Sequence, residues 1–193
     1  MCARHSARGA LHQGYRRKHL MCIRGSSELM VAGYQKFLEH IFWAVTYETQ
    51  KAKDLMSRYG NTVLEIYSHI RGSMTLGNML YSFQQQGVHG IANENTNINL
   101  YGPAFNVLVA SDLLGYVSDG KQTTVGFDGH RYDFVSRWIG GNSYTYKTIP
   151  SDSNAWKEWW RMFTDPNNVH TCLGHANDTC QKFYGSSHLK QKP

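Results

Sequence analysis

Two short stretches of the sequence carry the residue types that acid–base chemistry and metal binding require. The first contains His130 and Asp133 in the run Gly-His-Arg-Tyr-Asp-Phe. A histidine steered by a carboxylate is a common general base, so this pair, with His89 from an Asn-rich segment, predicts a hydrolase or nuclease-like effector. In a regular strand, however, side chains three residues apart point to opposite faces. The pair would need a β-bulge to meet, and we expect that it does not cooperate.

The second stretch, near the C-terminus, combines histidines with cysteines: His170, Cys172, His175, Cys180 and His188. The last four follow the spacing Cys-x2-His-x4-Cys-x7-His, which offers the ligand types of a tetrahedral zinc site. That interpretation describes a zinc-binding nucleic-acid-binding protein. The alternatives are two free thiols or a Cys172–Cys180 disulfide, which in the chain-entropy model stabilises the fold by about 2–3 kcal/mol. We favour the disulfide, with no cofactor.

An acceptor pattern for N-glycosylation, Asn177-Asp178-Thr179, lies between the two cysteines. A glycan at Asn177 and a disulfide belong to the same oxidising compartment. Charged residues make up only 18% of the chain and aromatic residues 13%, a composition that also favours an extracellular protein. The sequence shows no continuous apolar stretch typical of a secretory signal peptide, so this location remains an expectation.

The net positive charge is confined to residues 1–27, which contain six Lys or Arg and no Asp or Glu. Residues 28–193 hold 14 residues of each sign and are formally neutral. The basic segment is interpreted as a mitochondrial transit peptide, as a disordered basic arm, or as a part that does not belong to the native folded unit. Because the positive charge is not spread over the folded part, nucleic acid is disfavoured as a partner.

The spacing of apolar residues predicts that the first half of the chain is helical. Three- and four-residue steps predict a long helix over 28–59 and shorter helices over 62–71 and 73–86. Residues 87–103 are rich in Gly and Asn and predict a long ordered loop, where functional residues often lie. The apolar run at 105–117 fits either a strand or a helix.

Glycine pairs divide the second half of the chain at Asp119-Gly120, Asp128-Gly129 and Gly140-Gly141. Such pairs are typical of hairpin turns, because their central residues need positive φ. They predict strands at about 113–118, 121–127, 130–139 and 143–149, followed by a helix that ends at Phe163. Residues 28–193 are thus expected to form a single α+β domain. In it, a helical N-terminal half packs on a C-terminal antiparallel β-meander with a Trp-rich helix. No apolar run reaches the ~18 residues of a membrane span.

Aromatic and amide side chains favour recognition over catalysis. Trp156, Trp159, Trp160 and Phe163 share one face of the late helix, a pattern that by default packs into a core. An exposed Trp156 would instead favour an aromatic platform. The leading hypothesis is a secreted, toxin-like or binding domain, not an enzyme, that recognises a cell-surface glycan or protein. Its predicted contact residues are Asn93, Asn95, Asn97, Tyr101, Tyr144 and Trp156. The sequence carries no signal of an oligomeric state.

Overall fold

The frame of the protein is a mixed β-sheet, seen in a computed structural model that describes residues 19–24, 47–174, 178–186 and 188–192. The strands lie side by side in the order β1-β2-β3-β4-β5. The first four are parallel to one another, and the short last strand pairs antiparallel with β4. Their bounds are β1 His19–Arg24, β2 Leu64–His69, β3 Thr96–Tyr101, β4 Val125–Asp128 and β5 Lys190–Lys192.

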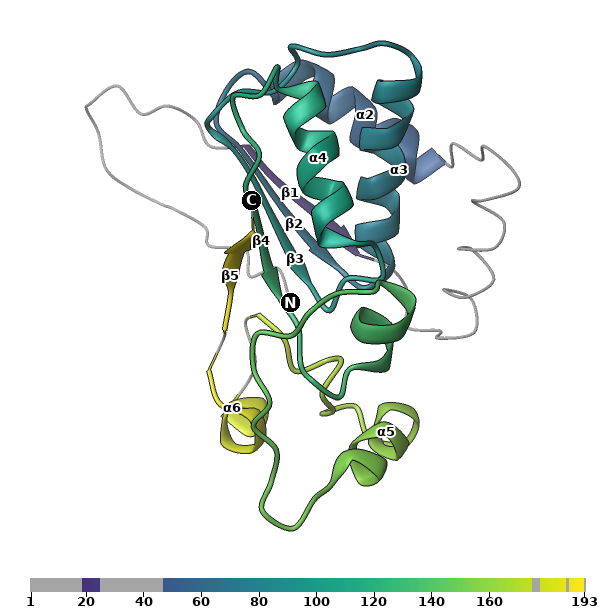
Figure 1. Ribbon diagram of the computed structural model, residues 1–193, viewed down its shortest axis with the longest axis vertical. Coiled ribbons are helices and arrows are strands. Elements are labelled where there is room, and N and C mark those ends of the chain that lie inside the picture. Colours follow the sequence, from purple (N-terminus) through teal and green to yellow (C-terminus); the bar gives the residue numbers. More distant parts are fainter. Residues whose placement is uncertain (1–18, 25–46, 175–177, 187, 193) are drawn as a thin grey trace, which may run out of the picture.

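Helices connect the parallel strands, because two parallel neighbours need a crossover rather than a hairpin. Helix α3 (Arg71–Gln85) joins β2 to β3, and α4 (Val107–Val117) joins β3 to β4. Helix α2 (Tyr47–Tyr59) precedes β2. All three helices pack together on one face of the sheet (Figure 1).

The main core lies between that face of the sheet and the three helices. Strands β2 and β3 alternate buried and more exposed side chains, as expected of a sheet covered more completely on one face. The buried set packs against apolar side chains of the helices in one cluster, which includes Leu64, Ile66, Ile98, Leu100, Met56, Leu76, Met79, Leu80 and Leu114. This packing fixes where each strand ends, and therefore where the residues after it lie.

Between β4 and β5 the chain leaves the sheet and forms a layer beyond the carboxyl ends of the parallel strands (Figure 1). It contains a π-helical turn, η1 (Val135–Ile139), and two helices, α5 (Ala155–Thr164) and α6 (Asp178–Tyr184). This layer has its own apolar cluster, built on Tyr146, Val169, Cys172, Leu173, Cys180 and Tyr184. It therefore closes the end of the sheet where a site is expected.

The predicted antiparallel meander is wrong, because the sheet is mixed and its central strands are parallel. Residues 62–71, predicted as a helix, contain β2, and the predicted loop 87–103 contains β3. Both strands are short. The apolar residues at 63, 66, 67 and 70 also fit a helical spacing, and the asparagines of β3 are typical of loops. Residues 113–117 of the segment 113–118, predicted as a strand, lie in α4.

The glycine pairs end elements rather than closing hairpins. Asp119 and Gly120 have φ of 54° and 75° and follow α4. Residues with positive φ are common after helices as well as in hairpins. The predicted strand 130–139 contains η1 instead. Only Tyr146 of the predicted strand 143–149 makes a bridge, to His130.

Other predicted elements are present. The helix predicted over 73–86 corresponds to α3, the ambiguous run 105–117 contains α4, and the Trp-rich helix is α5. Of the predicted helix 28–59, the described part is α2, and residues 28–46 lie outside the described residues. Within the basic segment, His19–Arg24 forms β1 and the remainder lies outside them. In the described part of the chain, every helix is too short or too polar to cross a bilayer.

Candidate functional site at the strand ends

The candidate site lies where the parallel strands end, the usual place for ligands on such sheets. Strand β2 leads directly into Ile70, β3 into Gly102 and β4 into Gly129. Two backbone hydrogen bonds hold these ends together: Ile70 N–H donates to the Tyr101 carbonyl (3.1 Å), and Gly102 N–H donates to the Asp128 carbonyl (2.9 Å). The residues that follow the three strands are thereby brought to one edge of the sheet.

A buried histidine–carboxylate pair lies at this edge. Nδ1 of His170 is 2.9 Å from Oδ1 of Asp133, and the two residues are 9% and 0% exposed. The same carboxylate oxygen accepts hydrogen bonds from the backbone N–H groups of Val135 (2.9 Å) and Ser136 (3.2 Å). These bonds fix the carboxylate at the start of η1. In the tautomer in which Nδ1–H donates to Asp133, Nε2 of His170 is the proton acceptor.

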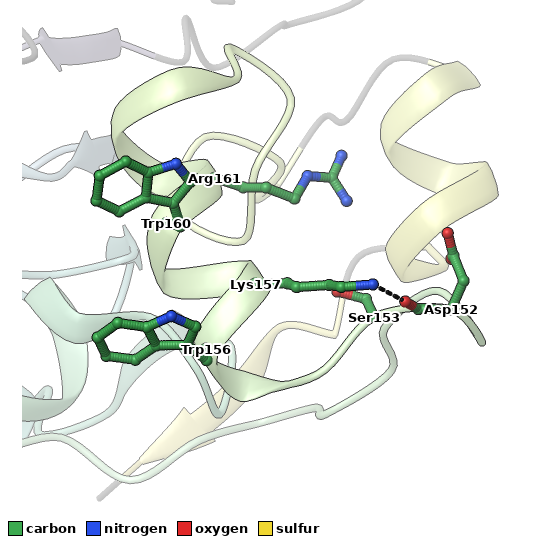
Figure 2. A pocket seen from close by; sticks show the side chains of 6 residues that line it. All are labelled: Asp152, Ser153, Trp156, Lys157, Trp160 and Arg161. Carbon is green, nitrogen blue, oxygen red and sulfur yellow. Dashed lines mark hydrogen bonds between the residues drawn. The ribbon is translucent and has the colours of Figure 1, made fainter.

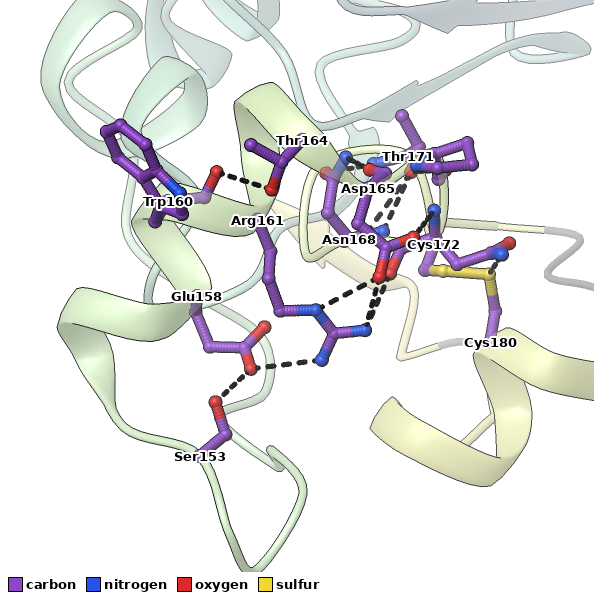
Figure 3. Close-up of polar contacts among 12 residues, drawn as sticks. Ser153, Glu158, Trp160, Arg161, Thr164, Asp165, Asn168, Thr171, Cys172 and Cys180 are labelled. Carbon is purple, nitrogen blue, oxygen red and sulfur yellow. Dashed lines mark hydrogen bonds and ion pairs between the residues drawn. A yellow bond between two sulfur atoms is a disulfide. The ribbon is translucent and has the colours of Figure 1, made fainter.

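Hydrogen bonds within the turn that follows α5 position His170. Oδ1 of Asn168 accepts from the backbone N–H groups of His170 (2.8 Å) and Thr171 (3.2 Å). The Asn168 amide in turn donates to the Asp165 carbonyl (2.6 Å). Cys172, two residues after His170, lies at disulfide distance from Cys180 on α6, with their Cα atoms 5.2 Å apart. Figure 3 shows this turn held between the two helices.

A buried carboxylate on α5 anchors that helix. Glu158 is 0% exposed and accepts hydrogen bonds from the hydroxyl of Tyr184 on α6 (2.7 Å) and from Ser153. Arg161 contacts it at 3.4 Å and also binds Asp165 at 2.8 Å (Figure 3). Burial, followed by the bond to Glu158, raises the pKa of Tyr184. This network holds α5 against α6, and it thereby supports the turn that carries His170.

A second histidine, His69, lies beside the pair at the last position of β2. Its ring centroid is 6.0 Å from that of His170. Burial, together with the charge of His170, lowers the pKa of His69 to about 4. His69 is therefore neutral at physiological pH and places no positive charge next to His170.

Glycine at position 102 lets the end of β3 approach the pair. Its φ is +52°, and a Cβ atom there would lie 2.6 Å from Cδ1 of Leu173, 3.0 Å from Oδ2 of Asp133 and 3.3 Å from Nδ1 of His170. Any larger side chain would press on both members of the pair. Gly102 thus forms one wall of the site.

The backbone at Ile70 is strained. Its φ and ψ are 51° and −115°, and Asp119 is the other non-glycine residue with positive φ in the described part of the chain. A β-branched residue rarely adopts such a conformation, and outliers of this kind concentrate at functional sites. The Ile70 side chain is 7% exposed and packs with Met74, Ala104 and Val135.

The structure places the predicted catalytic residues in three different environments. Asp133 bonds to His170 rather than to His130. The buried His130 makes its own contacts, with Nε2 2.9 Å from the Thr148 carbonyl and Nδ1 accepting from Tyr132 N–H at 3.1 Å. Burial lowers the pKa of His130. His89 is exposed and lies 2.7 Å from Asp119, next to the amino ends of β3 and β4. That edge is opposite to the one with His170.

The predicted binding residues do not form one surface. Asn93 and Asn95 form a turn before β3, with Asn95 N–H donating to Oδ1 of Asn93 (2.8 Å), and Asn97 is exposed on β3 near its amino end. Tyr101 lies at the carboxyl end, where burial raises its pKa to about 12. Tyr144 is 41% exposed, near the guanidinium groups of Arg131 and Arg137.

The alternative metal ligands are divided by the disulfide. Cys172 and Cys180 are bonded to each other, and a sulfur in a disulfide is not the thiolate that zinc requires. His188 stacks on Tyr146, with ring centroids 4.5 Å apart. His175 and the predicted glycosylation site Asn177 lie outside the described residues. Within the described ranges, no three His, Cys, Asp or Glu side chains gather as a metal site.

An aromatic surface, defined by Trp138, Trp156, Trp160 and Phe163, covers the outside of η1 and α5. These side chains are 64–73% exposed, so the expected packing of this face into the core is not seen. Trp156, Trp160, Lys157 and Arg161 also line a pocket of about 520 Å³ with Asp152 and Ser153. Figure 2 shows the two indole rings on one side of α5 and the two basic side chains on the other.

Comparisons with known proteins give no relative from which a function could be inferred. No protein-family model matches the chain, and neither the curated proteins nor the solved structures contain a match to it. The sequence pattern placed His170 in the same stretch as the alternative metal ligands and did not connect it with Asp133, 37 residues away. One sequence signal for the site was missed, at the end of β2. The short run 64–69 is separated from a helical pattern by one residue, which is typical of a strand–turn–helix unit. Such a unit would have indicated a parallel sheet whose strand ends form a site.

Proposed function

We propose that the protein is a hydrolase that acts on an ester or amide, with His170 as general base and Asp133 as the residue that orients it. The observation that carries this proposal is the buried His170–Asp133 pair at the carboxyl edge of a parallel sheet. By analogy of fold alone, hydrolases built on parallel sheets place their acid and their histidine at this edge.

The proposed step needs a proton acceptor next to a carbonyl substrate. Nε2 of His170 removes a proton from a water molecule while the water oxygen attacks the carbonyl carbon, and the same proton is then given to the departing alcohol or amine. Asp133 stabilises the imidazolium that forms between these steps. In the part of the chain that the structure describes, no hydrogen bond to Nε2 of His170 is found, which supports its availability.

Hydrolysis of p-nitrophenyl acetate and butyrate by the purified full chain tests this proposal. Replacing His170 by Ala should lower kcat/KM by about 10²-fold or more, the usual contribution of a general base. Asp133→Asn should also lower it, because the carboxylate no longer fixes the ring. His89→Ala is the matched control, since His89 also pairs with an aspartate but lies at the opposite edge of the sheet. Equal rates for the wild type and His170→Ala would contradict the proposal.

A second proposed function, recognition of a cell-surface glycan, is favoured by the aromatic surface. Exposed indole rings stack on sugar faces, and aromatic side chains dominate many recognition surfaces. Lys157 and Asp152, which line the same pocket as the two indole rings, would supply polar groups for sugar hydroxyls. Recognition and hydrolysis are compatible, because α5 carries the aromatic surface and leads into the turn with His170.

Quenching of tryptophan fluorescence by oligosaccharides of glucose, galactose and N-acetylglucosamine tests the second function. Binding that is lost in Trp156→Ala and kept in Tyr47→Ala would support it, because Tyr47 is an equally exposed aromatic residue on α2. Equal binding by both variants would assign the glycan to another surface.

An extracellular location is proposed together with recognition. The Cys172–Cys180 pair supports it, because disulfides persist in oxidising compartments. Mass spectrometry of the native protein would test it through the N-terminus, the disulfide and a glycan at Asn177. A reduced cysteine pair without the glycan would contradict it.

A further inference from the structure

The turn between β2 and α3 holds Ile70 in a conformation that its side chain disfavours. A non-glycine residue in a sparsely populated region of backbone conformation persists only where the surroundings impose it. Here the carbonyl of Ile70 accepts from Ser73 N–H (3.0 Å) and from the Ser73 hydroxyl (2.5 Å), while its N–H donates to Tyr101. Both backbone groups of Ile70 are thus held by neighbouring elements.

The same turn lies beside the His170–Asp133 pair. Ile70 N–H donates to the carbonyl of Tyr101, the residue before Gly102, and a Cβ atom added at Gly102 would press on both members of the pair. Its side chain packs on Val135, whose N–H donates to Asp133. Its chain neighbour His69 faces the ring of His170. Through the ends of β2 and β3 and through η1, position 70 is therefore linked to the edge of the site.

A strained strand-to-helix turn next to a histidine–carboxylate pair is typical of hydrolases that form a covalent intermediate. In hydrolases that use a covalent step, this turn exposes the nucleophile, and the backbone N–H of the next residue helps to bind the oxyanion. The nucleophile, the acid and the histidine then follow in that order along the chain. Positions 70, 133 and 170 have the same order here.

We propose that Ile70 occupies the nucleophile position of this site, so that the turn is built for a covalent step that the side chain of Ile70 cannot perform. The inference rests on the proposed hydrolase function and adds to it that hydrolysis proceeds without an acyl-enzyme. Ser73 does not replace the missing hydroxyl. Its Oγ donates to the Ile70 carbonyl and accepts from Phe105 N–H at 3.1 Å, so it is engaged in holding the turn.

Covalent labelling of the full chain by a fluorescent fluorophosphonate tests the inference. In Ile70→Ser, the introduced oxygen would attack phosphorus, fluoride would leave, and the hydroxyl proton would pass to Nε2 of His170. We expect labelling at least 100-fold faster than in the wild type, with the adduct mapped to position 70 by peptide mass spectrometry. Ile70→Ala is the matched control without a hydroxyl, and Ile70→Ser/His170→Ala should lose the gain.

A second variant covers the case in which Ile70→Ser does not fold. Ile70→Cys retains a small apolar side chain, and iodoacetamide should alkylate it faster than it does in Ile70→Cys/His170→Ala. A folded Ile70→Ser that reacts no faster than Ile70→Ala, or a folded Ile70→Cys whose alkylation is independent of His170, would overturn the inference.

The two proposals fail in different ways. Labelling of Ile70→Ser that requires His170, combined with a wild type that hydrolyses no ester, would support the nucleophile position and contradict hydrolysis by the natural chain. Ester hydrolysis by the wild type that requires His170, without any labelling of Ile70→Ser, would support the hydrolase and contradict the nucleophile position.

Discussion

Nδ1 of His170 lies 2.9 Å from Oδ1 of Asp133, although 37 residues separate them in the sequence. The carboxylate is fixed by the start of η1, and the imidazole by the turn after α5. The contact therefore forms only when η1 and the turn after α5 pack next to each other beyond the sheet. The stability and the reactivity of the site should both depend on how closely the sheet end supports this contact.

Gly102→Ala should destabilise the protein and disturb the pair. The added methyl group would lie 2.6 Å from Leu173 and 3.0 Å from Asp133, and overpacking of this kind costs about 1–3 kcal/mol. Gly120→Ala is the matched control, because Gly120 has φ of +75° and open space around it. Urea unfolding of both variants separates the cost of the clash from that of the backbone. Equal losses would show that the site wall tolerates a methyl group.

The backbone strain at Ile70 predicts an unusual order of stabilities. Ile70→Ala and Ile70→Gly remove the same buried contacts, but glycine also relieves the strain of φ 51° and ψ −115°. We expect the glycine variant to be more stable than the alanine variant by about 1–2 kcal/mol. Thermal and urea unfolding would measure the difference. A more stable alanine variant, as in an ordinary helix, would mean that the turn is not strained.

Acidification should destabilise the fold through the buried His130 and the half-buried His69. Burial lowers the pKa of His69 to about 4 and also lowers that of His130. Between the unfolded value of about 6.5 and the folded value, the unfolded chain binds protons that the folded chain does not, so stability falls as the pH falls. The contribution of His69 is at most about 3 kcal/mol, and its partial exposure reduces it.

His69→Gln, measured by urea unfolding between pH 7 and pH 4, isolates one part of this effect. The variant should lose less stability over that window than the wild type, because glutamine does not titrate. A slope that His69→Gln does not alter would contradict the shifted pKa of this residue.

Tyr184→Phe should weaken the support of α5. The substitution leaves Oε2 of the buried Glu158 without its 2.7 Å donor, which costs about 1–3 kcal/mol. Tyr144→Phe removes a hydroxyl from an exposed tyrosine and should change the free energy of unfolding by less than about 0.5 kcal/mol. If both variants unfold at the same urea concentration, the hydrogen bond from Tyr184 to Glu158 does not contribute to the stability of the fold.

Reduction of the Cys172–Cys180 pair should lower stability by about 2–3 kcal/mol, the chain-entropy value for a loop of this size. Because Cys172 is two residues from His170, ester hydrolysis should also fall. A Cys172→Ala/Cys180→Ala variant tests both effects without a reducing agent. Unchanged unfolding of this variant would show that the pair contributes little to the turn.

The local pattern of the sequence determined the long elements and little of their arrangement. The spacing of apolar residues in α3 and the aromatic spacing in α5 specify helices, because a helical face needs only neighbours in the same segment. The pairs Asp119-Gly120 and Gly140-Gly141 follow α4 and η1, whereas Asn97 and Asn99, predicted to lie in a loop, are within β3. The pattern could not distinguish hairpins from helix ends, because positive φ serves both. It also did not reveal β2 and β3, which have six residues each and depend on pairing with neighbouring strands from distant parts of the chain.

Only the tertiary structure decided which chemical groups meet. The sequence showed that Asp133 and His170 have the right types, but the nearest histidine in the chain, His130, bonds instead to the backbone of Tyr132 and Thr148. The carboxyl ends of parallel strands collect residues from distant segments, so the partner of Asp133 depends on the packing of α5 and α6 on the sheet end. The strain at Ile70 likewise exists only once β2 and α3 are fixed by the core.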